Sequence, residues 1–457
     1  VLLYQFHDIL PGSSIKRVYD ECYARYEQML VRVAALRDER YRALAARAGT
    51  TVAFNSLAWD RTEWLKADGG WRQVTVPALG TAPLLAPTTS TEPMFADRTR
   101  LANGRLSVGF APDGQIVSIR DQQTGREYVP AGEFANTLVA IVDKGDAWDF
   151  EADFEKKDPW IYLGLPVMQP TLVSVTAAVD GPCAAVTQVW RVWNSEIRQT
   201  IRLLAGSDRI EFDTEVDWRD VARMLRVRFP LAVQADEASF EIPFGHIRRS
   251  TREDNLVQRA QLEVAAQQWV DLAEPTHGVA LLNDCKYGHR VKGHTLDLCL
   301  IRCVPHPNFA IAAKDVPEDS PAGTFTDVGR HVFRYALLPH EGPTDAARLT
   351  RAAREFNTPL PVVRAPKTAT SNPLPEPPFK LDRPEIEVAA FKRAESGNGW
   401  AVRLVNVTER PVSATLTLAT HTAAECDLME RPIGTGTAKG EVALQFAAFE
   451  VKTVCLT

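Results

Sequence analysis

A histidine and an aspartate stand side by side near the start of the chain, inside the apolar stretch VLLYQFHDILPGSSI. Burying an ionised carboxylate or an unpaired imidazole costs several kcal/mol unless another group pairs with it. We therefore expect the stretch to be buried and His7 and Asp8 to meet a partner there. From the residues alone, a salt-linked or helix-capping pair competes with metal and substrate binding.

A second candidate patch is Trp148 with Asp149, in the segment GDAWDFEADF. An aromatic ring beside carboxylates is the combination that a sugar-binding platform uses. The structural alternative is a loop tryptophan that covers a sheet, with solvated acids around it. Tyr162, in PWIYLG, is a weaker candidate for the same pocket.

The remaining reactive residue types favour structural roles. The mixed charge run of residues 248–254 is typical of a solvated loop, with cleft lining as the alternative. In NDCKYG, residues 283–288, we expect turn chemistry with Lys286 as a structural ion partner. His331 and His340 are expected to be satisfied core or edge histidines.

The seven cysteines form an odd set with no CxxC pair. This indicates reduced thiols in a cytoplasmic protein rather than a disulfide framework or a cysteine zinc site. Cys285, Cys299 and Cys303 have no base in evident register, so a nucleophilic thiol is not expected. The first residues lack a basic region and a cleavage site, so they are not a signal peptide.

Size and charge restrict the class of protein. The 457 residues suggest about three domains at roughly 150 residues each, and 45% hydrophobic with 24% charged residues is the composition of a soluble globular protein. The net charge of -6, without a basic run, argues against nucleic acid as a partner. No apolar run is long enough to span a membrane.

The elements that must position these residues begin with one long amphipathic helix, or two with a break, over residues 13–49. After Gly49 the apolar period changes to two, which predicts antiparallel sheet to about residue 345 and a large β-sandwich. Residues 111–121 predict a hairpin with its turn at Asp113-Gly114.

Changes of apolar period and composition divide the chain. Residues 358–384, rich in proline, are predicted to form an extended linker or a surface strap before a last small β-sandwich. The residues themselves separate the end of a helical domain (1–49), the antiparallel sheet that follows it, the linker (358–384) and a C-terminal β-sandwich (385–457). The fold class is therefore mainly β with an N-terminal α-helical segment.

Several long motifs resemble those of glycoside hydrolase family 38, the class II α-mannosidases. Their residues are similar to those of the family's cytosolic/vacuolar branch. They occur in the family's order from the first residues to the last. These motifs are QFHDILPGSSI with VYDEC, VAFNSLAWDR, LANGRLSVGFAPDGQIVSIRDQQTGRE, DAWDFEADFE, FEIPFGHIRRSTRED, HGVALLNDCKYG, DVGRHVFRYALLPHEG and FEVKT. The resemblance divides the sheet region into a small β domain (50–100) and a large, galactose-mutarotase-like β-supersandwich (101–357). It also implies a retaining exo-α-mannosidase that removes terminal α-mannose from oligosaccharides.

The resemblance also implies roles for the candidate residues. His7 would be a ligand of one divalent ion, usually Zn²⁺, and Asp8 would hydrogen-bond hydroxyls of the bound mannose. Trp148 and Asp149 stay candidates for substrate contact on their residue types alone. A neutral imidazole is a good Zn²⁺ ligand, and a carboxylate can pair with both the ion and sugar hydroxyls.

The family's nucleophile, acid/base carboxylate and remaining metal ligands lie in an N-terminal barrel upstream of residue 1. No His-x-Asp pair occurs in this sequence, and one imidazole cannot hold zinc tightly. We therefore expect that barrel as the missing partner, with zinc not retained and no activity in this chain alone. A homo-oligomer is retained as an alternative for the assembly of the protein.

Two alternatives remain. A related enzyme of the superfamily that cleaves mannosylglycerate would differ only in substrate. The alternative from another class is a non-catalytic carbohydrate-binding or structural β-sandwich protein.

Overall fold

The computed structural model describes residues 1–150, 167–309, 312–317, 320, 323–366, 376–433 and 436–457. The chain forms two compact units, which are described separately below. The first unit contains Val1–Arg37, Ser90–Ala238 and Arg249–Pro343, and the second contains Asp38–Thr89, Ser239–Arg248 and Thr344–Thr457. The predicted domain boundaries stay predictions.

The first unit is built on two large antiparallel sheets. One has the order β10 (Val167–Met168), β9 (Thr137–Val142), β15 (Arg223–Pro230), β22 (Thr295–Cys303), β21 (Gly288–Lys292) and β18 (Val264–Ala265). The other has the order β11 (Thr171–Asp180), β12 (Cys183–Val192), β13 (Ser195–Leu204), β14 (Ile210–Trp218), β23 (Gly329–Glu341), β20 (His277–Asn283) and β19 (Trp269–Ala273). Two further strands, β16 (Glu237–Ile242) and β17 (Gly245–Ser250), include the boundary between the units.

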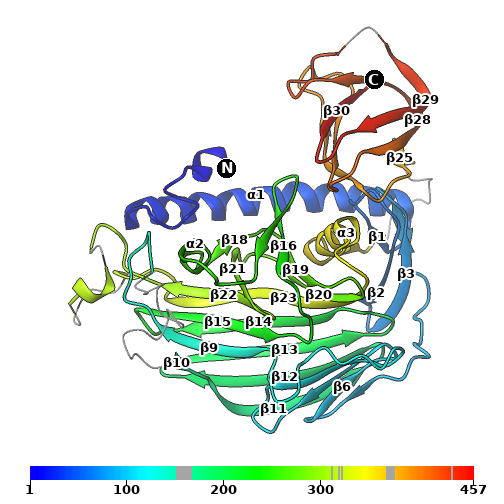
Figure 1. Cartoon of the computed structure of the whole chain (residues 1–457). Coiled ribbons are helices and arrows are strands. Elements are labelled where there is room, and N and C mark those ends of the chain that lie inside the picture. Colours follow the sequence, from blue (N-terminus) through cyan, green and yellow to red (C-terminus); the bar gives the residue numbers. More distant parts are fainter. Residues whose placement is uncertain (151–166, 310–311, 318–319, 321–322, 367–375, 434–435) are drawn as a thin grey trace. The chain divides into compact units, whose positions relative to one another are not determined.

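Buried aromatic rings join the two sheets into a sandwich. Phe229 of β15 lies 5.8 Å from Phe212 of β14 and 6.0 Å from Tyr335 of β23, measured between ring centroids. All three side chains are almost fully buried, so the period of two along these strands places the apolar face of each sheet against the other. Figure 1 shows the long strands of both sheets running in similar directions. The predicted large β-sandwich is confirmed.

A smaller sheet contains the predicted hairpin. Its order is β5 (Phe95–Ala96), β6 (Arg100–Ala102), β7 (Leu106–Phe110) and β8 (Ile116–Asp121). The amide of Gly114 donates to the carbonyl of Ala111, and Gly114 has a φ of +86°. The Asp113-Gly114 turn is therefore where the sequence predicts it. Short helices of the first unit are η1 (Leu2–Gln5), α2 (Leu256–Ala260) and η3 (Ala313–Asp315).

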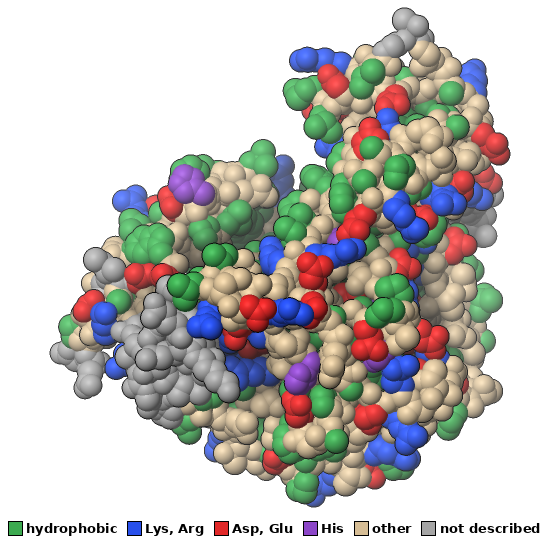
Figure 2. Space-filling model, viewed as in Figure 1, with side chains coloured by type: hydrophobic (Ala, Val, Ile, Leu, Met, Phe, Trp, Pro, Cys, Tyr) green, Lys and Arg blue, Asp and Glu red, His purple; other side chains and the backbone are tan. Residues whose placement is uncertain are grey.

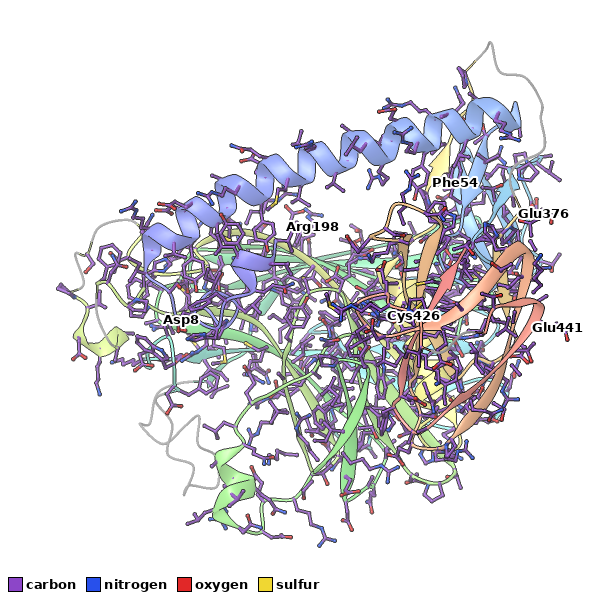
Figure 3. The ribbon with its side chains drawn as sticks, turned by 90° about the horizontal axis from the view of Figure 1, so that it is seen from above. Asp8, Phe54, Arg198, Glu376, Cys426 and Glu441 are labelled. Carbon is purple, nitrogen blue, oxygen red and sulfur yellow. The ribbon has the colours of Figure 1, made fainter. Side chains whose placement is uncertain are left out.

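The predicted N-terminal helix is one continuous element, α1 (Lys16–Ala48), as Figure 3 shows. It ends at Gly49, which has a φ of +72°, a conformation that glycine adopts at little cost. The last turns of the helix belong to the second unit, and within that unit Tyr41 stacks on Phe54 with ring centroids 4.6 Å apart. The break that the sequence left open does not occur.

The second unit combines short strands, a helix and a terminal sandwich. Near its start, β1 (Val52–Phe54) pairs with β4 (Thr81–Pro83) and β24 (Val362–Val363), and β2 (Arg61–Ala67) pairs with β3 (Gly70–Val76). The terminal sheet has the order β25 (Phe379–Leu381), β28 (Val412–Cys426), β30 (Val451–Leu456), β27 (Trp400–Asn406) and β26 (Ile386–Arg393), with β29 (Ala438–Phe446) on β28. Helix α3 (Ala346–Asn357) packs through Ala347 against Val405 of this sheet.

The predicted linker contributes two of these strands. Val363 of β24 pairs with Val52 of β1, and Phe379 of β25 pairs with Leu418 of β28. Both ends of residues 358–384 are therefore paired in sheets, and the linker or strap stays a prediction. Residues 367–375 lie outside the described part of the chain, as does Tyr162.

The surface agrees with the charge balance of the sequence. Figure 2 shows acidic and basic side chains intermingled on the face that it presents. Among the described helices, none is long and apolar enough to cross a membrane.

Candidate functional site

The opening segment, residues 1–15, is a short η1 turn followed by an irregular loop. The amides of Ile9 and Leu10 both donate to the carbonyl of Phe6, and these bonds curl the chain around the His7-Asp8 pair. His7 Nε2 lies 3.5 Å from Asp8 Oδ2, and the two side chains are 78% and 50% exposed. The pair is therefore presented on a tight, solvent-facing turn.

The expectation that this apolar stretch is buried is wrong for this chain. Leu2, Leu3, Phe6 and Leu10 are each more than half exposed, and only Tyr4 of η1 is buried. No described side chain other than Asp8 forms an ion pair with His7. The apolar residues therefore surround His7 and Asp8 without removing them from water.

Two tyrosines attach the opening segment to helix α1. The Tyr19 hydroxyl lies 3.2 Å from the carbonyl oxygens of both Asp8 and Ile9, to which it can donate, and it accepts from the amide of Ser14 at 3.1 Å. Tyr4 packs on Tyr26, with ring centroids 5.3 Å apart. The backbone that carries the pair is thus held by the first turns of the helix.

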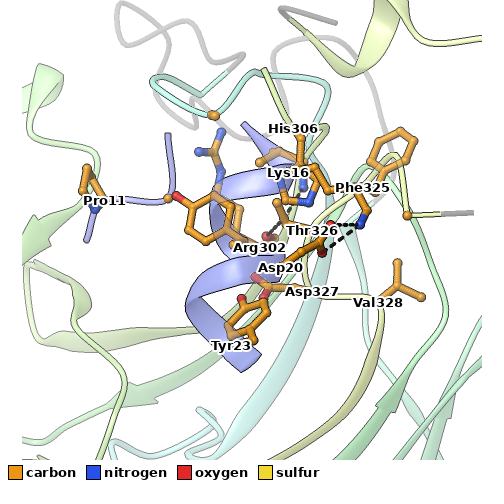
Figure 4. Close-up of a pocket in the computed structure, with 15 residues that line it drawn as sticks. Pro11, Lys16, Asp20, Tyr23, Arg302, His306, Phe325, Thr326, Asp327 and Val328 are labelled. Carbon is orange, nitrogen blue, oxygen red and sulfur yellow. Dashed lines mark hydrogen bonds and ion pairs between the residues drawn. The ribbon is translucent and has the colours of Figure 1, made fainter. Parts of the chain in front are cut away.

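A cavity of about 440 Å³ lies beside this attachment, and we call it the α1 pocket (Figure 4). Such a volume is within the ~300–1,000 Å³ range of small-molecule sites. Its walls come from the residues that follow Asp8, from the first two turns of α1, from the loop before Trp148, and from the chain around the end of β22 and the start of β23. The lining residues are Pro11, Gly12, Lys16, Tyr19, Asp20, Tyr23, Ala147, Arg302, Val304, His306, Gly323, Phe325, Thr326, Asp327 and Val328.

The Trp148 loop is held next to the pocket by Arg302. Asp146 accepts hydrogen bonds from the amides of Trp148 and Asp149, at 2.8 Å each. Arg302 donates from Nη2 to the Asp149 carbonyl at 2.8 Å and pairs through Nε with Asp143 at 2.7 Å. The Trp148 side chain is 61% exposed. Trp148 and Asp149 thus adjoin the pocket through Ala147, but their own side chains do not line it.

His306 and Asp327 are polar groups of the pocket that sequence reasoning missed. His306 is only 7% exposed, and its Nδ1 has no hydrogen-bond partner among the described residues. Burial lowers the pKa of His306, and the nearby Lys16 lowers it further. Burial raises the pKa of Asp327, against the opposing charge of His331. The motif DVGRH contains Asp327 and could have directed attention to it.

The structural interpretations of His340 and His331 are confirmed. His340 pairs with Asp271 at 2.9 Å in the core, and His331 Nε2 lies 2.8 Å from the Asp327 carbonyl. In the 283–288 turn, Asn283 accepts from the Lys286 amide at 2.8 Å, so the predicted turn chemistry is present. Lys286 forms no ion pair with a described residue, and its ammonium lies 4.7 Å from the centre of the Phe333 ring instead.

In the charge run of residues 248–254, Arg252 pairs with Asp236 at 2.7 Å, and both side chains are largely exposed, as expected for a solvated loop. All seven cysteines are free, and burial raises the pKa of Cys285 to about 12. A thiol with such a pKa is protonated at neutral pH and is a poor nucleophile.

His7 and Asp8 are donors of the types that zinc accepts, but they are only two. The described residues contain no group of three or more His, Cys, Asp or Glu side chains placed to hold a metal ion. Zinc sites take at least three protein ligands, and among the described residues His7 and Asp8 would be part of such a set.

Three family models match the chain in succession. Residues 1–44 match the α-mannosidase middle domain, residues 101–310 the glycosyl hydrolases family 38 C-terminal domain, and residues 385–454 the family 38 C-terminal beta sandwich domain. The chain belongs to glycosyl hydrolase family 38. The resemblance seen in the sequence motifs is thereby confirmed.

Relatives of this family 38 chain carry α-mannosidase names. Human alpha-mannosidase 2C1 is 32% identical over 489 residues, which cover 100% of the chain and 44% of the human protein. The alpha-mannosidase of Saccharomyces cerevisiae is 28% identical over 373 residues, covering 78% of the chain and 31% of the yeast protein. The chain therefore spans less than half the length of these relatives.

Solved structures support the same fold. An α-mannosidase from Enterococcus faecalis V583 superposes with a TM-score of 0.78 at 17% identity, covering 100% of this chain and 62% of that one. A family 38 protein from Enterococcus faecalis also has a TM-score of 0.78, at 16% identity, covering 99% of this chain and 64% of that one.

Proposed function

We propose that this chain is the C-terminal portion of a retaining exo-α-mannosidase that removes terminal α-D-mannose from oligosaccharides. The observation that carries the proposal is the succession of three family 38 models along one chain, together with 32% identity to human alpha-mannosidase 2C1 over the whole chain. The nucleophilic and acid/base carboxylates would come from a barrel that precedes residue 1. Retaining chemistry places such a pair about 5–5.5 Å apart.

In this proposal the opening segment completes the sugar site. His7 is one ligand of a zinc ion, Asp8 accepts hydrogen bonds from hydroxyls of the terminal mannose, and Tyr19 holds the backbone at Asp8 and Ile9. When bound, the ion holds sugar hydroxyls and favours a distorted ring. The exposure of the His7-Asp8 turn supports the proposal, because an apolar surface with a metal-binding imidazole at its centre suits an interface with the missing barrel.

Trp148 and Asp149 are proposed to form the wall of the site on the side of the α1 pocket. An exposed indole on a loop fixed by Asp146 and Arg302 offers a rigid apolar face to a sugar ring. We also propose a galactose-mutarotase-like class for the supersandwich and a cytoplasmic location, in keeping with the free thiols.

The stereochemistry of the first product tests the proposed reaction. The full-length protein should hydrolyse an aryl α-mannoside, and proton NMR should detect α-mannose before mutarotation. Asp8→Asn should lower kcat/KM at least about tenfold, because it weakens a charge-assisted hydrogen bond to substrate. β-Mannose as the first product, or no hydrolysis of any α-mannoside, would contradict the proposal.

A further inference from the structure

A groove of about 890 Å³ lies within the second unit, and we call it the Arg351 groove. It is lined by residues 58–60, 77–78, 351, 376–377, 379–382, 384 and 417–419. These residues come from the loops on either side of the β2–β3 hairpin, from α3, and from strands β25 and β28 of the terminal sheet. Glu376, labelled in Figure 3, is one of them.

Arg351 is an unusual arginine in this groove. Its guanidinium lies 4.8 Å from the centre of the Trp59 ring. Arg351 forms no hydrogen bond or ion pair with the residues that the structure describes. Burial lowers the pKa of its guanidinium, and the negative charges of Glu355 and Glu385 oppose this shift. By contrast, Arg354 on the same helix pairs with Glu387 at 2.5 Å. None of the Arg351 nitrogens is a fully buried atom without a partner, so its donors are open to the groove, where acceptor oxygens of an occupant would pair with them.

The arginine is also held in place before any occupant arrives. Trp59 donates from Nε1 to Glu355 Oε1 at 2.8 Å, and this bond fixes the indole on which the guanidinium stacks. A planar fork held against a fixed ring loses little entropy when it binds two oxygens.

Fixed acceptors line the same groove. Asp60 accepts from the amide of Ala78 at 2.9 Å, and Asp382 accepts from the amide of Thr415 at 2.7 Å. Each of these bonds uses Oδ1, so each carboxylate is oriented while Oδ2 has no hydrogen bond to a described residue. The groove therefore offers oriented donors and oriented acceptors together.

The mixture of groups points to a neutral polyhydroxyl occupant. The ionisable lining side chains are two basic ones, Arg351 and Lys380, and three acidic ones, Asp60, Glu376 and Asp382, so a phosphate or a polyanion would be repelled as much as attracted. Sugar hydroxyls both donate and accept, and vicinal pairs match a guanidinium or a carboxylate in bidentate geometry. The prolines and Leu418 supply apolar surface for the C–H faces of a sugar ring.

We propose that the Arg351 groove binds an oligosaccharide, independently of the His7-Asp8 turn, which lies in the first unit. Arg351 donates to ring hydroxyls, and Asp60 and Asp382 accept from them. The choice of an α-mannose oligosaccharide as the probe rests on the proposed function. The binding itself requires neither the ion nor the barrel.

Isothermal titration of this chain with α-mannotriose, in the presence of EDTA, tests the proposal. We expect saturable binding that Arg351→Gln and Asp382→Asn each weaken at least about tenfold, as expected for lost hydrogen bonds to charged groups. Arg348→Gln is the matched control, because Arg348 is exposed one turn earlier on α3, and it should bind like the unmodified chain.

Thermal unfolding of each variant separates loss of binding from loss of structure. If Arg351→Gln unfolds at a lower temperature, the affinity of Asp60→Asn for mannotriose tests the proposal instead. This variant should keep its structure, because its Oδ1 still accepts from the Ala78 amide. The proposal is overturned if mannotriose does not bind saturably, if the groove variants bind as tightly as Arg348→Gln, or if inorganic phosphate displaces the sugar. None of these results would affect hydrolysis by the full-length protein, so the two proposals fail separately.

Discussion

The Tyr19 hydroxyl is the hydrogen-bonding link between the opening segment and helix α1. It contacts the carbonyl oxygens of Asp8 and Ile9 and the amide of Ser14, while its ring lies 5.6 Å from that of His306. Burial raises the pKa of Tyr19, so the hydroxyl keeps its proton at neutral pH. One side chain therefore couples the His7-Asp8 turn to the α1 pocket.

Removal of this hydroxyl should loosen the turn without unfolding the unit. We expect Tyr19→Phe to cost about 1 kcal/mol of stability and to speed hydrogen exchange at the amides of residues 8–14. Hydrogen exchange with mass spectrometry measures this. Tyr23→Phe is the control, since that side chain is largely exposed on the next turn. Equal exchange in both variants would show that the hydroxyl does not hold the turn.

His289 should make the stability of the first unit depend on pH. Burial, assisted by the charge of Arg226, lowers the pKa of His289 to about 3 in the folded chain, compared with 6.5 for an ordinary histidine. Between these two pKa values the His289 imidazole is protonated in the unfolded chain and neutral in the folded chain. The free energy of unfolding therefore falls as the pH falls below 6.5. The lowered pKa of His289 should reduce the free energy of unfolding by about 2 kcal/mol when the pH falls from 7 to 5.

Urea unfolding at the two pH values gives the measurement. His289→Gln should flatten the pH dependence by about that amount, whereas His7→Gln, at an exposed position, should leave it unchanged. An identical pH dependence in His289→Gln would show that His289 is not the group responsible.

Among the helices and strands, apolar periodicity and turn residues in the sequence predicted many of the elements that the structure contains. The helix over residues 13–49 and the hairpin at Asp113-Gly114 depend on local spacing, and both are present. The short strands β24 and β25 were not predicted, because two or three residues carry no readable period and their pairing partners are distant in sequence.

The exposure of the opening segment could not be predicted either. Composition shows how apolar a segment is. It does not show whether the surface that covers the segment lies within these 457 residues. The loop that fixes Trp148 likewise depends on Arg302, which is more than 150 residues away. His306 and Asp327 meet the start of α1 only through the fold.

Gly114 tests an element-scale contact that local pattern does not reveal. A β-carbon there would lie 2.9 Å from Trp190 and 3.0 Å from Leu172, in addition to the strain of a positive φ. We expect Gly114→Ala to destabilise the chain by about 2–4 kcal/mol, from strain and overpacking together. Gly132→Ala, with a φ of +83° and open space, should cost about 1 kcal/mol from strain alone. Equal losses in thermal unfolding would exclude the packing contribution.

At the scale of the whole molecule, the chain spans 44% of the human relative, and we propose that the remaining part brings the catalytic carboxylates. This chain should show no turnover of an aryl α-mannoside with added zinc, and addition of the separately produced N-terminal region should restore it. Turnover by the chain alone would place the catalytic carboxylates within these residues.

Zinc at His7 in the full-length protein is the most direct test of the proposed site. An anomalous-scattering map at the zinc edge should show one ion about 2.0–2.1 Å from an imidazole nitrogen of His7, and His7→Ala should lower zinc occupancy and activity together. Full zinc occupancy in His7→Ala, or a map with no ion beside His7, would contradict the assignment.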